Sequence, residues 1–343
     1  MTGGGARRRR IPAWFYAVLA ALVVVPFATA EVVLRRLGYT PAGGGFANEP
    51  VLFEPDLELG WRNAPGRHVF PGYTPDAGTI TVTIDSEGRR ITAPGPRIGW
   101  RTALVGDSFT EGWAISDADT FAWKLQERQP RLVIENYGVG GYGTYQSYLR
   151  MRQLLREKRP PEIYLYGFVG DHGRRNVADP AWLRALTARS RAPVSAPYCT
   201  LSEGGRLVHH PPERISRFPL RAQLASAFFL EQWSIGVGAA PRTAQEQEVL
   251  RTLIREMDEA ARARIVRFAV VILTAHPGQA RRFVSFLQSE GIPFIDCNRQ
   301  LGPGRVVAGE GHPNEIVHEE WAECIAAAID PLIPQTPPRG TKP

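Results

Sequence analysis

The chain has 343 residues, of which 43% are hydrophobic and 22% are charged, enough for one large domain with an appendage. Its formal net charge is +7, and part of that excess comes from four arginines at positions 7–10. Nucleic acid is not an expected partner, because the sequence shows no basic stripe interleaved with aromatic residues.

The first expected element is a membrane-spanning helix over residues 11–30, which carry no charge. A helix of about 20 residues, rising about 1.5 Å per residue, can cross a bilayer core of about 30 Å. The arginines just before it predict a cytoplasmic basic tail at residues 1–10. The rest of the chain should then lie on the extracytoplasmic side of the cell membrane.

A cleaved secretory signal is the alternative interpretation of this segment, because Ala28-Thr29-Ala30 resembles a small-x-small cleavage site. The apolar stretch exceeds the usual signal core of about 7–15 residues, which favours a retained single-pass anchor. Both interpretations send the following domain across the membrane.

Residues 31–97 are expected to form a linker and a small β appendage. The alternation Ile-Thr-Val-Thr-Ile at 80–84 predicts a strand, and Asp85-Ser86-Glu87-Gly88 predicts a turn after it. About 60 residues make only a marginal core, so this segment should pack on the larger domain.

From residue 98 to residue 330 apolar strands alternate with segments of helical periodicity, including the stripe Leu250, Leu253, Ile254, Met257 and Ala261. Thr243-Ala244-Gln245-Glu246 predicts a capping box before that stripe. The alternation predicts an α/β fold, a flavodoxin-like three-layer α/β/α arrangement with a parallel sheet. Strands are expected near residues 103–105, 133–134, 163–165, 268–273 and 293–295, and helices near 121–125, 145–158, 250–261 and 279–289.

Residues 178–242 interrupt this rhythm with several prolines, and we interpret them as an insertion near the mouth of the site, with a helix at 225–230 and His209-His210 in a Pro-rich loop. The tail at 331–343 holds four further prolines besides Pro331 and is expected to be disordered.

The three cysteines, Cys199, Cys297 and Cys324, allow at most one internal disulfide, and the spacing does not choose the pair. Buried, unpaired cysteines are an equally good interpretation. No metal site is predicted, because there is no Cys-x-x-Cys motif and no clustered histidine pair beyond His209-His210.

Three residues supply the groups that acyl-transfer chemistry needs. Ser108 stands in a turn that follows an apolar run, and Glu310 and His312 stand together near the end of the chain. A serine hydroxyl needs a neighbouring base to take its proton, and an imidazole, with an ordinary pKa of about 6.5, suits that task. We predict that Ser108 is the nucleophile, that His312 is the base, and that Glu310 orients the imidazole.

Two blocks, Gly106-Asp107-Ser108 and Asn136-Tyr137-Gly138-Val139-Gly140-Gly141, make residues 98–330 resemble the SGNH (GDSL-type) hydrolase superfamily, as a membrane-anchored bacterial-type member. The resemblance implies that Ser108 is the nucleophile and that the backbone N–H groups of Ser108 and Gly141 form part of an oxyanion hole. It implies no cofactor.

Two blocks depart from the family pattern. The third block normally reads Gly-x-Asn-Asp, but Val169 or Gly170 stands at the position of its asparagine. Asn176, Asp171 or His172 could substitute for it, and the sequence does not choose among them; Asn176 is the candidate that we assign to the oxyanion hole. Asp171 cannot donate as a carboxylate and is expected to position the loop.

In the last block Glu310 stands two residues before His312, whereas the family usually places an aspartate three residues before the histidine. The remaining candidates near the site are Asp107, Asp171 and His172.

The expected function is that of a serine esterase that acts through an acyl-enzyme on the outer side of the membrane. The substrate would carry an ester or acyl group and could be a lipid, a polysaccharide or a small ester. One alternative is an O-acyltransferase that passes the acyl group to an envelope or exopolysaccharide sugar. A second alternative is a non-enzymatic carbohydrate-binding module on the same fold, which the missing asparagine favours.

Overall fold

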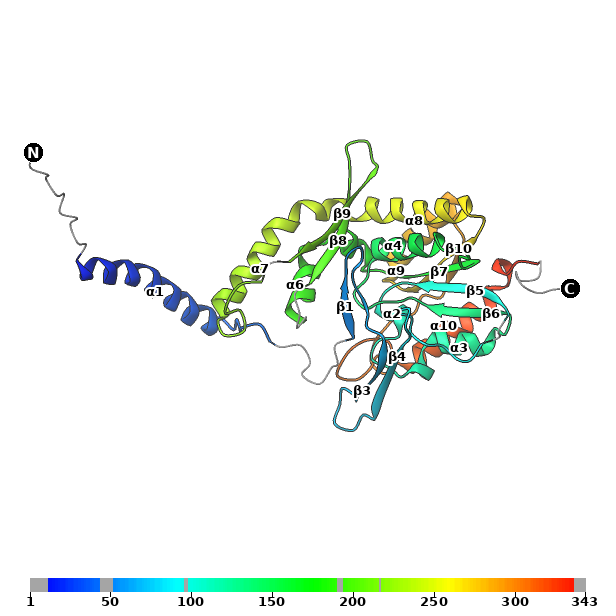
Figure 1. Cartoon of the computed structure of the whole chain (residues 1–343), viewed down its shortest axis with the longest axis horizontal. Coiled ribbons are helices and arrows are strands. Elements are labelled where there is room, and N and C mark those ends of the chain that lie inside the picture. The colour runs from blue at the N-terminus through cyan, green and yellow to red at the C-terminus, as the bar shows by residue number, and fades with distance from the viewer. Residues whose placement is uncertain (1–11, 44–51, 96–97, 190–193, 216, 336–343) are drawn as a thin grey trace, which may run out of the picture.

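A computed structural model describes residues 12–43, 52–95, 98–189, 194–215 and 217–335 (Figure 1). The predicted cytoplasmic tail and most of the predicted disordered tail, residues 336–343, lie outside the described residues.

The centre of the described chain is a five-stranded parallel sheet in the order β11-β10-β7-β5-β6. Numbered by their order in the sequence, these strands lie in the order 2-1-3-4-5, read from the β6 edge, which is the flavodoxin-like arrangement. The central strand β7 is buried along its whole length, as expected when both faces of a parallel sheet are covered. The strands are β5 (Trp100–Val105), β6 (Leu132–Asn136), β7 (Ile163–Val169), β10 (Arg267–Thr274) and β11 (Phe294–Asp296).

Helices cover both faces of the sheet and produce the predicted three layers (Figure 1). Along β10, Phe268, Val270 and Ile272 face one core, whereas the alternate residues Ala269 and Val271 face the other. The first core is covered by α4 (Thr144–Leu155), α8 (Glu246–Ala263) and α9 (Pro277–Glu290), and the second by α3 (Phe121–Arg128) and α10 (Glu315–Ala328). The predicted fold class is therefore confirmed.

The apolar N-terminal segment forms α1 (Ala13–Arg36), which continues six residues beyond the predicted end at residue 30. This helix is long and apolar enough to cross a membrane, and no residue in its most apolar part is buried. A signal sequence would meet the same criteria of length and composition. Its last turns contact α7 (Ala225–Ala239). There the Glu31 carboxylate accepts hydrogen bonds from the backbone N–H groups of Ala225 and Ser226 and from the Ser226 hydroxyl.

The β appendage consists of two hairpins. The predicted strand at 80–84 is present as β4, and the Asp85 side chain closes the predicted turn by accepting the N–H groups of Glu87 and Arg89. Phe70, with Ile80 and its neighbours, forms a small core of its own. The strands are β1 (Phe53–Asp56), β2 (Gly60–Asn63), β3 (Gly66–Pro71) and β4 (Thr79–Ile84).

The appendage is fixed to the large domain by Arg90, which is 1% exposed. Its guanidinium donates to the Asp117 carboxylate at 3.1 Å and to the carbonyl oxygens of Gly112 and Ile115 at 2.5 and 2.7 Å. Those three residues follow the Ser108 turn in sequence. The appendage is thus joined to the segment that carries Ser108.

The insertion contains more regular structure than its prolines suggested. His209 and His210 lie in a strand, β9, and not in a loop as predicted. Proline is tolerated there because β8 and β9 form a two-stranded sheet that pairs with no other described strand. The predicted helix at 225–230 is present as the start of α7. The elements are α5 (His172–Asn176), α6 (Pro180–Arg189), β8 (Ser195–Leu201), β9 (Leu207–Arg214), α7 and the 3₁₀ helix η2 (Ala240–Gln245).

The predicted capping box at 243–246 is wrong, although the buried stripe of α8 that follows it is confirmed. The Thr243 hydroxyl donates to the Asp179 carboxylate at 3.0 Å instead of accepting a backbone N–H. Moreover, η2 continues directly into α8, so Gln245 has helical dihedral angles and leaves no position for a cap. A tertiary contact has overridden a local one.

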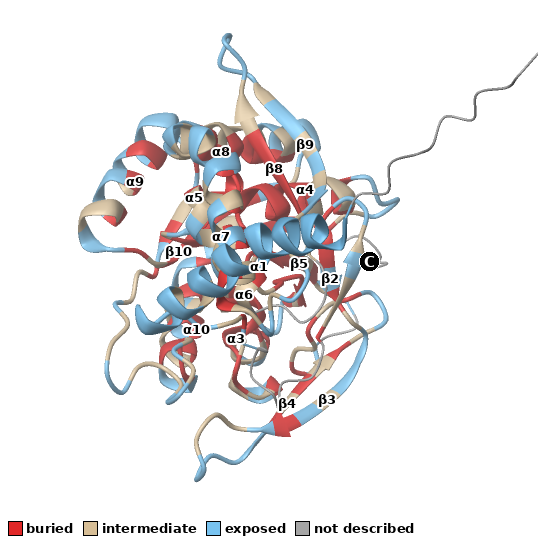
Figure 2. Ribbon diagram, turned by 90° about the vertical axis from the view of Figure 1, so that its left-hand side faces the viewer, coloured by how far each residue is buried: buried red, intermediate tan, exposed pale blue. Residues whose placement is uncertain are grey.

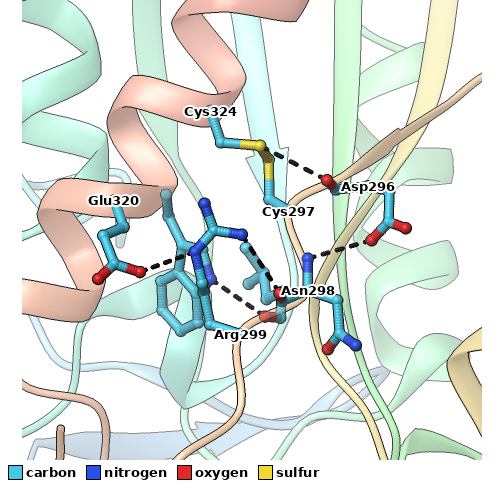
Figure 3. Close-up of a disulfide and its surroundings, with 8 residues drawn as sticks. Asp296, Cys297, Asn298, Arg299, Glu320 and Cys324 are labelled. Atoms are coloured by element: carbon cyan, nitrogen blue, oxygen red, sulfur yellow. Dashed lines mark hydrogen bonds and ion pairs between the residues drawn. A yellow bond between two sulfur atoms is a disulfide. The ribbon is translucent and has the colours of Figure 1, made fainter. Parts of the chain in front are cut away.

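Cys297 and Cys324 form a disulfide, and Cys199 is buried and free. Figure 3 shows Cys297, just after β11, joined to Cys324 on α10, with the Arg299–Glu320 ion pair beside them. The bridge closes a loop with a sequence separation of 27 residues, which stabilises the folded chain by about 3–4 kcal/mol in the chain-entropy model. The closed loop includes His312.

His318 on α10 makes stability depend on pH. Its Nδ1 accepts the Phe121 N–H at 3.1 Å, and burial lowers the pKa of this imidazole to about 3. The unfolded chain binds a proton at this residue below about pH 6.5, whereas the folded chain does not. The contribution of neutral His318 is therefore complete above about pH 6.5 and is lost progressively as the pH falls toward 3.

We expect the free energy of unfolding to fall by about 2 kcal/mol between pH 7 and pH 5 through this residue alone, since each pKa unit corresponds to about 1.4 kcal/mol. His318→Asn keeps an acceptor for the Phe121 N–H and removes the titration, so its decline should be shallower. Urea unfolding at the two pH values measures the difference, with the exposed His276→Asn as the control. Equal slopes in all three proteins would contradict the assignment.

Candidate active site

Ser108 is the first residue of the short helix α2 (Ser108–Glu111), directly after β5. The order of the strands in the sheet reverses between β5 and β7, and ligands in open α/β sheets bind at such a point, beyond the carboxyl ends of the strands. Asp107 caps α2, because its carboxylate accepts the Phe109 N–H at 3.0 Å. As the first residue of a helix, Ser108 has an N–H group with no partner inside the helix.

The structure brings Ser108, His312 and Glu310 together. His312 Nε2 lies 2.9 Å from Ser108 Oγ, although 204 residues separate them. On the other side of the ring, His312 Nδ1 lies 2.7 and 2.8 Å from the two Glu310 carboxylate oxygens. Both distances fall in the range of a nucleophile–base–orienter chain. The extra methylene of glutamate therefore does not prevent the contact.

The loop that carries the acid and the base folds on itself before α10 begins. The Glu310 carboxylate also accepts the backbone N–H of His312 at 2.8 Å, and Asn314 caps α10. Burial disfavours the charged form of Glu310, but hydrogen bonds from His312 and Trp113 lower its pKa below the ordinary value. A carboxylate that stays ionised can stabilise an imidazolium that forms beside it.

Glu310→Gln should lower kcat by about 10³- to 10⁴-fold, less than the loss of the serine or of the base. The amide still bonds to the imidazole but offers no negative charge to the imidazolium that forms during the reaction. The measurement is steady-state hydrolysis of an activated ester by the purified full chain. Glu315→Gln, on the first turn of α10, is the control, and equal rates for the two variants would remove Glu310 from the mechanism.

The glycine loop of the second block is held close to the nucleophile turn by Asn136. Its side chain donates to the Thr110 carbonyl at 2.9 Å and accepts the Gly138 N–H at 3.0 Å. At Gly138 a Cβ atom would lie 2.3 Å from the Glu111 nitrogen, so only glycine fits. Gly141 has φ +81°, a conformation that favours glycine.

The β appendage contributes aromatic side chains to the surroundings of this loop. The Trp61 indole N–H donates to the Gly140 carbonyl at 2.9 Å. Phe53 of β1 stacks on Trp113 with ring centroids 5.8 Å apart, and Trp113 lies 6.3 Å from the His312 ring. The appendage therefore helps to shape the site as well as packing on the domain.

The candidates for the third block lie on α5 and just before it. Asn176 is buried, and its Oδ1 accepts the Tyr145 N–H at 2.9 Å, which occupies the side chain at the start of α4. His172 is fully buried, with Nε2 3.2 Å from Asp107 Oδ2 and Nδ1 bonded to the Tyr166 hydroxyl. Asp171 is largely exposed and lies 3.8 Å from Arg174.

Asp107 is the buried centre of a charged cluster behind the nucleophile. Burial disfavours its charged form, but His172, Arg175 and the Phe109 N–H lower the pKa of this carboxyl well below its ordinary value. Asp107 is therefore ionised next to Ser108, with Arg175 at 2.9 Å as its cationic partner.

Three residues near the site were missed in the sequence: Trp113, Trp61 and Arg175. Trp113 stands five residues after Ser108. No motif marks this position, and only the nature of its side chain could have suggested that it belongs to the site. Trp61 reaches the glycine loop through a contact 79 residues away in sequence. Arg175 sits beside Arg174, and nothing in the sequence distinguishes the two. Within the described residues no group of three or more histidine, cysteine or acidic side chains could hold a metal ion.

No protein-family model matches the chain, and the curated proteins contain no significant match. Solved structures similar to it include TesA, at 13% identity and TM-score 0.40, covering 68% of this chain and 99% of that one. A member of the lipolytic protein G-D-S-L family from Veillonella parvula DSM 2008 matches at 12% and 0.39, covering 67% and 98%. AlinE4, an SGNH-hydrolase family esterase, matches at 14% and 0.34, covering 71% and 100%. The second and third of these proteins carry the name of the superfamily that the sequence motifs resemble.

Proposed function

We propose that the protein is a serine esterase that hydrolyses ester or O-acyl groups through an acyl-enzyme. The observation that carries this proposal is the continuous chain from Ser108 Oγ through His312 to the Glu310 carboxylate. A buried, ionised acid, an imidazole and a hydroxyl in this order have the geometry of a nucleophilic triad.

The chemistry follows from the positions of the three groups. Ser108 Oγ attacks the acyl carbon while its proton passes to His312 Nε2, and the carbonyl oxygen becomes an oxyanion. The C–O bond to the leaving alcohol then breaks, and His312 returns the proton to the alkoxide. Water attacks the acyl-enzyme with His312 again as the base, and the acid and free Ser108 are released. The N–H groups of Ser108 and Gly141 would stabilise the oxyanion in both steps.

The proposal places the catalytic domain outside the cytoplasm, held by α1. The Cys297–Cys324 disulfide supports that side, because disulfides persist in oxidising compartments. The exposed apolar residues Leu230, Trp233 and Val237 lie on α7, whose start contacts the end of α1, and they support a position near lipid. A reporter fused after residue 343 should be active only outside the cytoplasm, and cytoplasmic activity would overturn this topology.

The direct test of the reaction uses a serine-directed fluorophosphonate on the purified full chain, followed by mass mapping of the adduct. The adduct should form at Ser108 and should be absent from Ser108→Ala. Absence of any adduct in the wild-type chain would overturn the esterase proposal and favour the carbohydrate-binding module. Preferential capture of the acyl group by added sugar, rather than by water, would instead identify the O-acyltransferase, which uses the same acyl-enzyme.

A further inference from the structure

Arg175 joins the two segments that would form the oxyanion hole. Its Nη1 donates to Asp107 Oδ2 at 2.9 Å and to the Tyr142 carbonyl oxygen at 2.7 Å. Asp107 directly precedes Ser108, and Tyr142 directly follows Gly141. One nitrogen therefore holds the nucleophile turn and the glycine loop together, at the residues that flank both proposed N–H donors.

The backbone is built to admit this side chain. At Gly143 a Cβ atom would lie 2.9 Å from Arg175 Cβ and 2.7 Å from Asn176 Oδ1, so any larger residue would push α5 away from the glycine loop. The arginine side chain is 15% exposed, whereas Asp107 is fully buried. The Arg175 side chain thus extends from the partly exposed edge of the charged cluster to the buried Asp107 carboxylate at its centre.

The other third-block candidates do not suit a role at the oxyanion. A donor to the substrate must be reachable from the site, but His172 is fully buried with both ring nitrogens close to Asp107 and Tyr166. The Asn176 amide nitrogen is also sealed and has no hydrogen-bond partner. Asp171 is an acid and lies on the surface. Among the described residues of the third block, only Arg175 is hydrogen-bonded to both segments.

We propose that Arg175 is the positioning residue that replaces the missing asparagine of the third block. It acts by fixing Tyr142 and Asp107 so that the Gly141 and Ser108 N–H groups converge on the developing oxyanion. The two N–H bonds of the single nitrogen Nη1 lie in the guanidinium plane and hold two acceptors in a set geometry, whereas the N–H bonds of an ammonium rotate freely. This inference rests on the proposed function, because it concerns the transition state of the acyl transfer at Ser108.

The expected effect is on kcat and not on substrate binding. Arg175→Ala should lower kcat by about 100-fold, the range seen when one oxyanion donor is lost, with KM changed by less than about threefold. Arg175→Lys keeps the charge but not the planar NH2 group of Nη1 and should recover less than a tenth of the lost rate. Added guanidinium at millimolar concentration should partly restore the alanine variant. Arg174→Ala, in the same short helix but paired with Asp171 and Asp179, is the matched control and should stay within about twofold of wild type.

The same proteins are then treated with the fluorophosphonate, whose adduct carries a tetrahedral phosphorus with an oxygen in the oxyanion position. Slow labelling of Arg175→Ala, fast labelling of Arg174→Ala and guanidinium rescue would support the proposal, even where the thermal midpoint of the alanine variant is lower. If both variants label at the wild-type rate, or if lysine restores full activity, the positioning role is overturned while the esterase proposal stands. If the wild-type chain does not label at Ser108, both proposals fall together.

Discussion

Ser108→Ala and His312→Ala should each lower kcat by about 10⁴- to 10⁶-fold, and the double variant should lose little more than either single one. The reason is the 2.9 Å contact between Ser108 Oγ and His312 Nε2, which makes the two residues one unit. Without the base the hydroxyl is a poor nucleophile, and without the hydroxyl the base has no proton to take. Once one partner is gone, the other therefore has little left to contribute.

The measurement is hydrolysis of an activated ester by the full chain in detergent, with circular dichroism and thermal unfolding to show that the fold is retained. Ser86→Ala, at an exposed serine in the turn after β4, is the control and should keep full activity. If the losses of the two single variants multiply in the double variant, the residues act independently and the triad assignment is wrong.

Arg90→Met should lower the free energy of unfolding by about 3–5 kcal/mol, the range for removing one partner of a buried ion pair. The substitution leaves the Asp117 carboxylate without its buried cation and removes the donors to the Gly112 and Ile115 carbonyl oxygens. Because those groups belong to the segment after Ser108, ester hydrolysis should fall as well, even where the variant remains folded.

The neighbouring Arg89→Met is the matched control. Arg89 is a quarter exposed and pairs with Asp85 at the surface, and its more buried partner Glu135 keeps Arg101 as a closer cation, so its loss should cost no more than about 1 kcal/mol. Urea unfolding of both variants gives the two free energies. Similar losses for the two would show that the buried cluster around Arg90 does not hold the appendage in place.

The sequence predicted most of the structural features that depend on residues close together in the chain. The strand before Ser108 and the α8 stripe around Leu253 both follow from local periodicity, and both are present. What it missed depends on contacts between distant segments. Thr243 lost its capping role to Asp179, 64 residues away, and the His209 strand is fixed by pairing with Cys199 on β8. Local patterns contain no information about such partners.

The candidate site shows the same division. Ser108, His312 and Glu310 could be named in advance because their chemistry and spacing are distinctive. The third block could not, since Arg174 and Arg175 are adjacent and chemically identical. Only the direction in which α5 presents each side chain separates an arginine on the surface from one that contacts Asp107. The disulfide partner of Cys297 was undetermined for a similar reason, because only the fold brings it within 5.8 Å of Cys324, measured between Cα atoms.

The three hydrogen bonds that Glu31 accepts from the start of α7 fix the angle between the end of α1 and the body of the protein. An enzyme joined to its anchor by a flexible linker would sample a large volume above the bilayer and would meet substrates at many distances from the bilayer. Here the end of α1 is hydrogen-bonded to the body, and Arg35 adds a bond to the Gln223 carbonyl oxygen. In an anchored chain Ser108 would then keep a constant distance from the lipid surface and a constant orientation toward it. Ser108 would then reach only acyl groups that lie in a thin layer at this distance from the bilayer. The position of an acyl group, as well as its chemistry, would therefore decide whether it is a substrate.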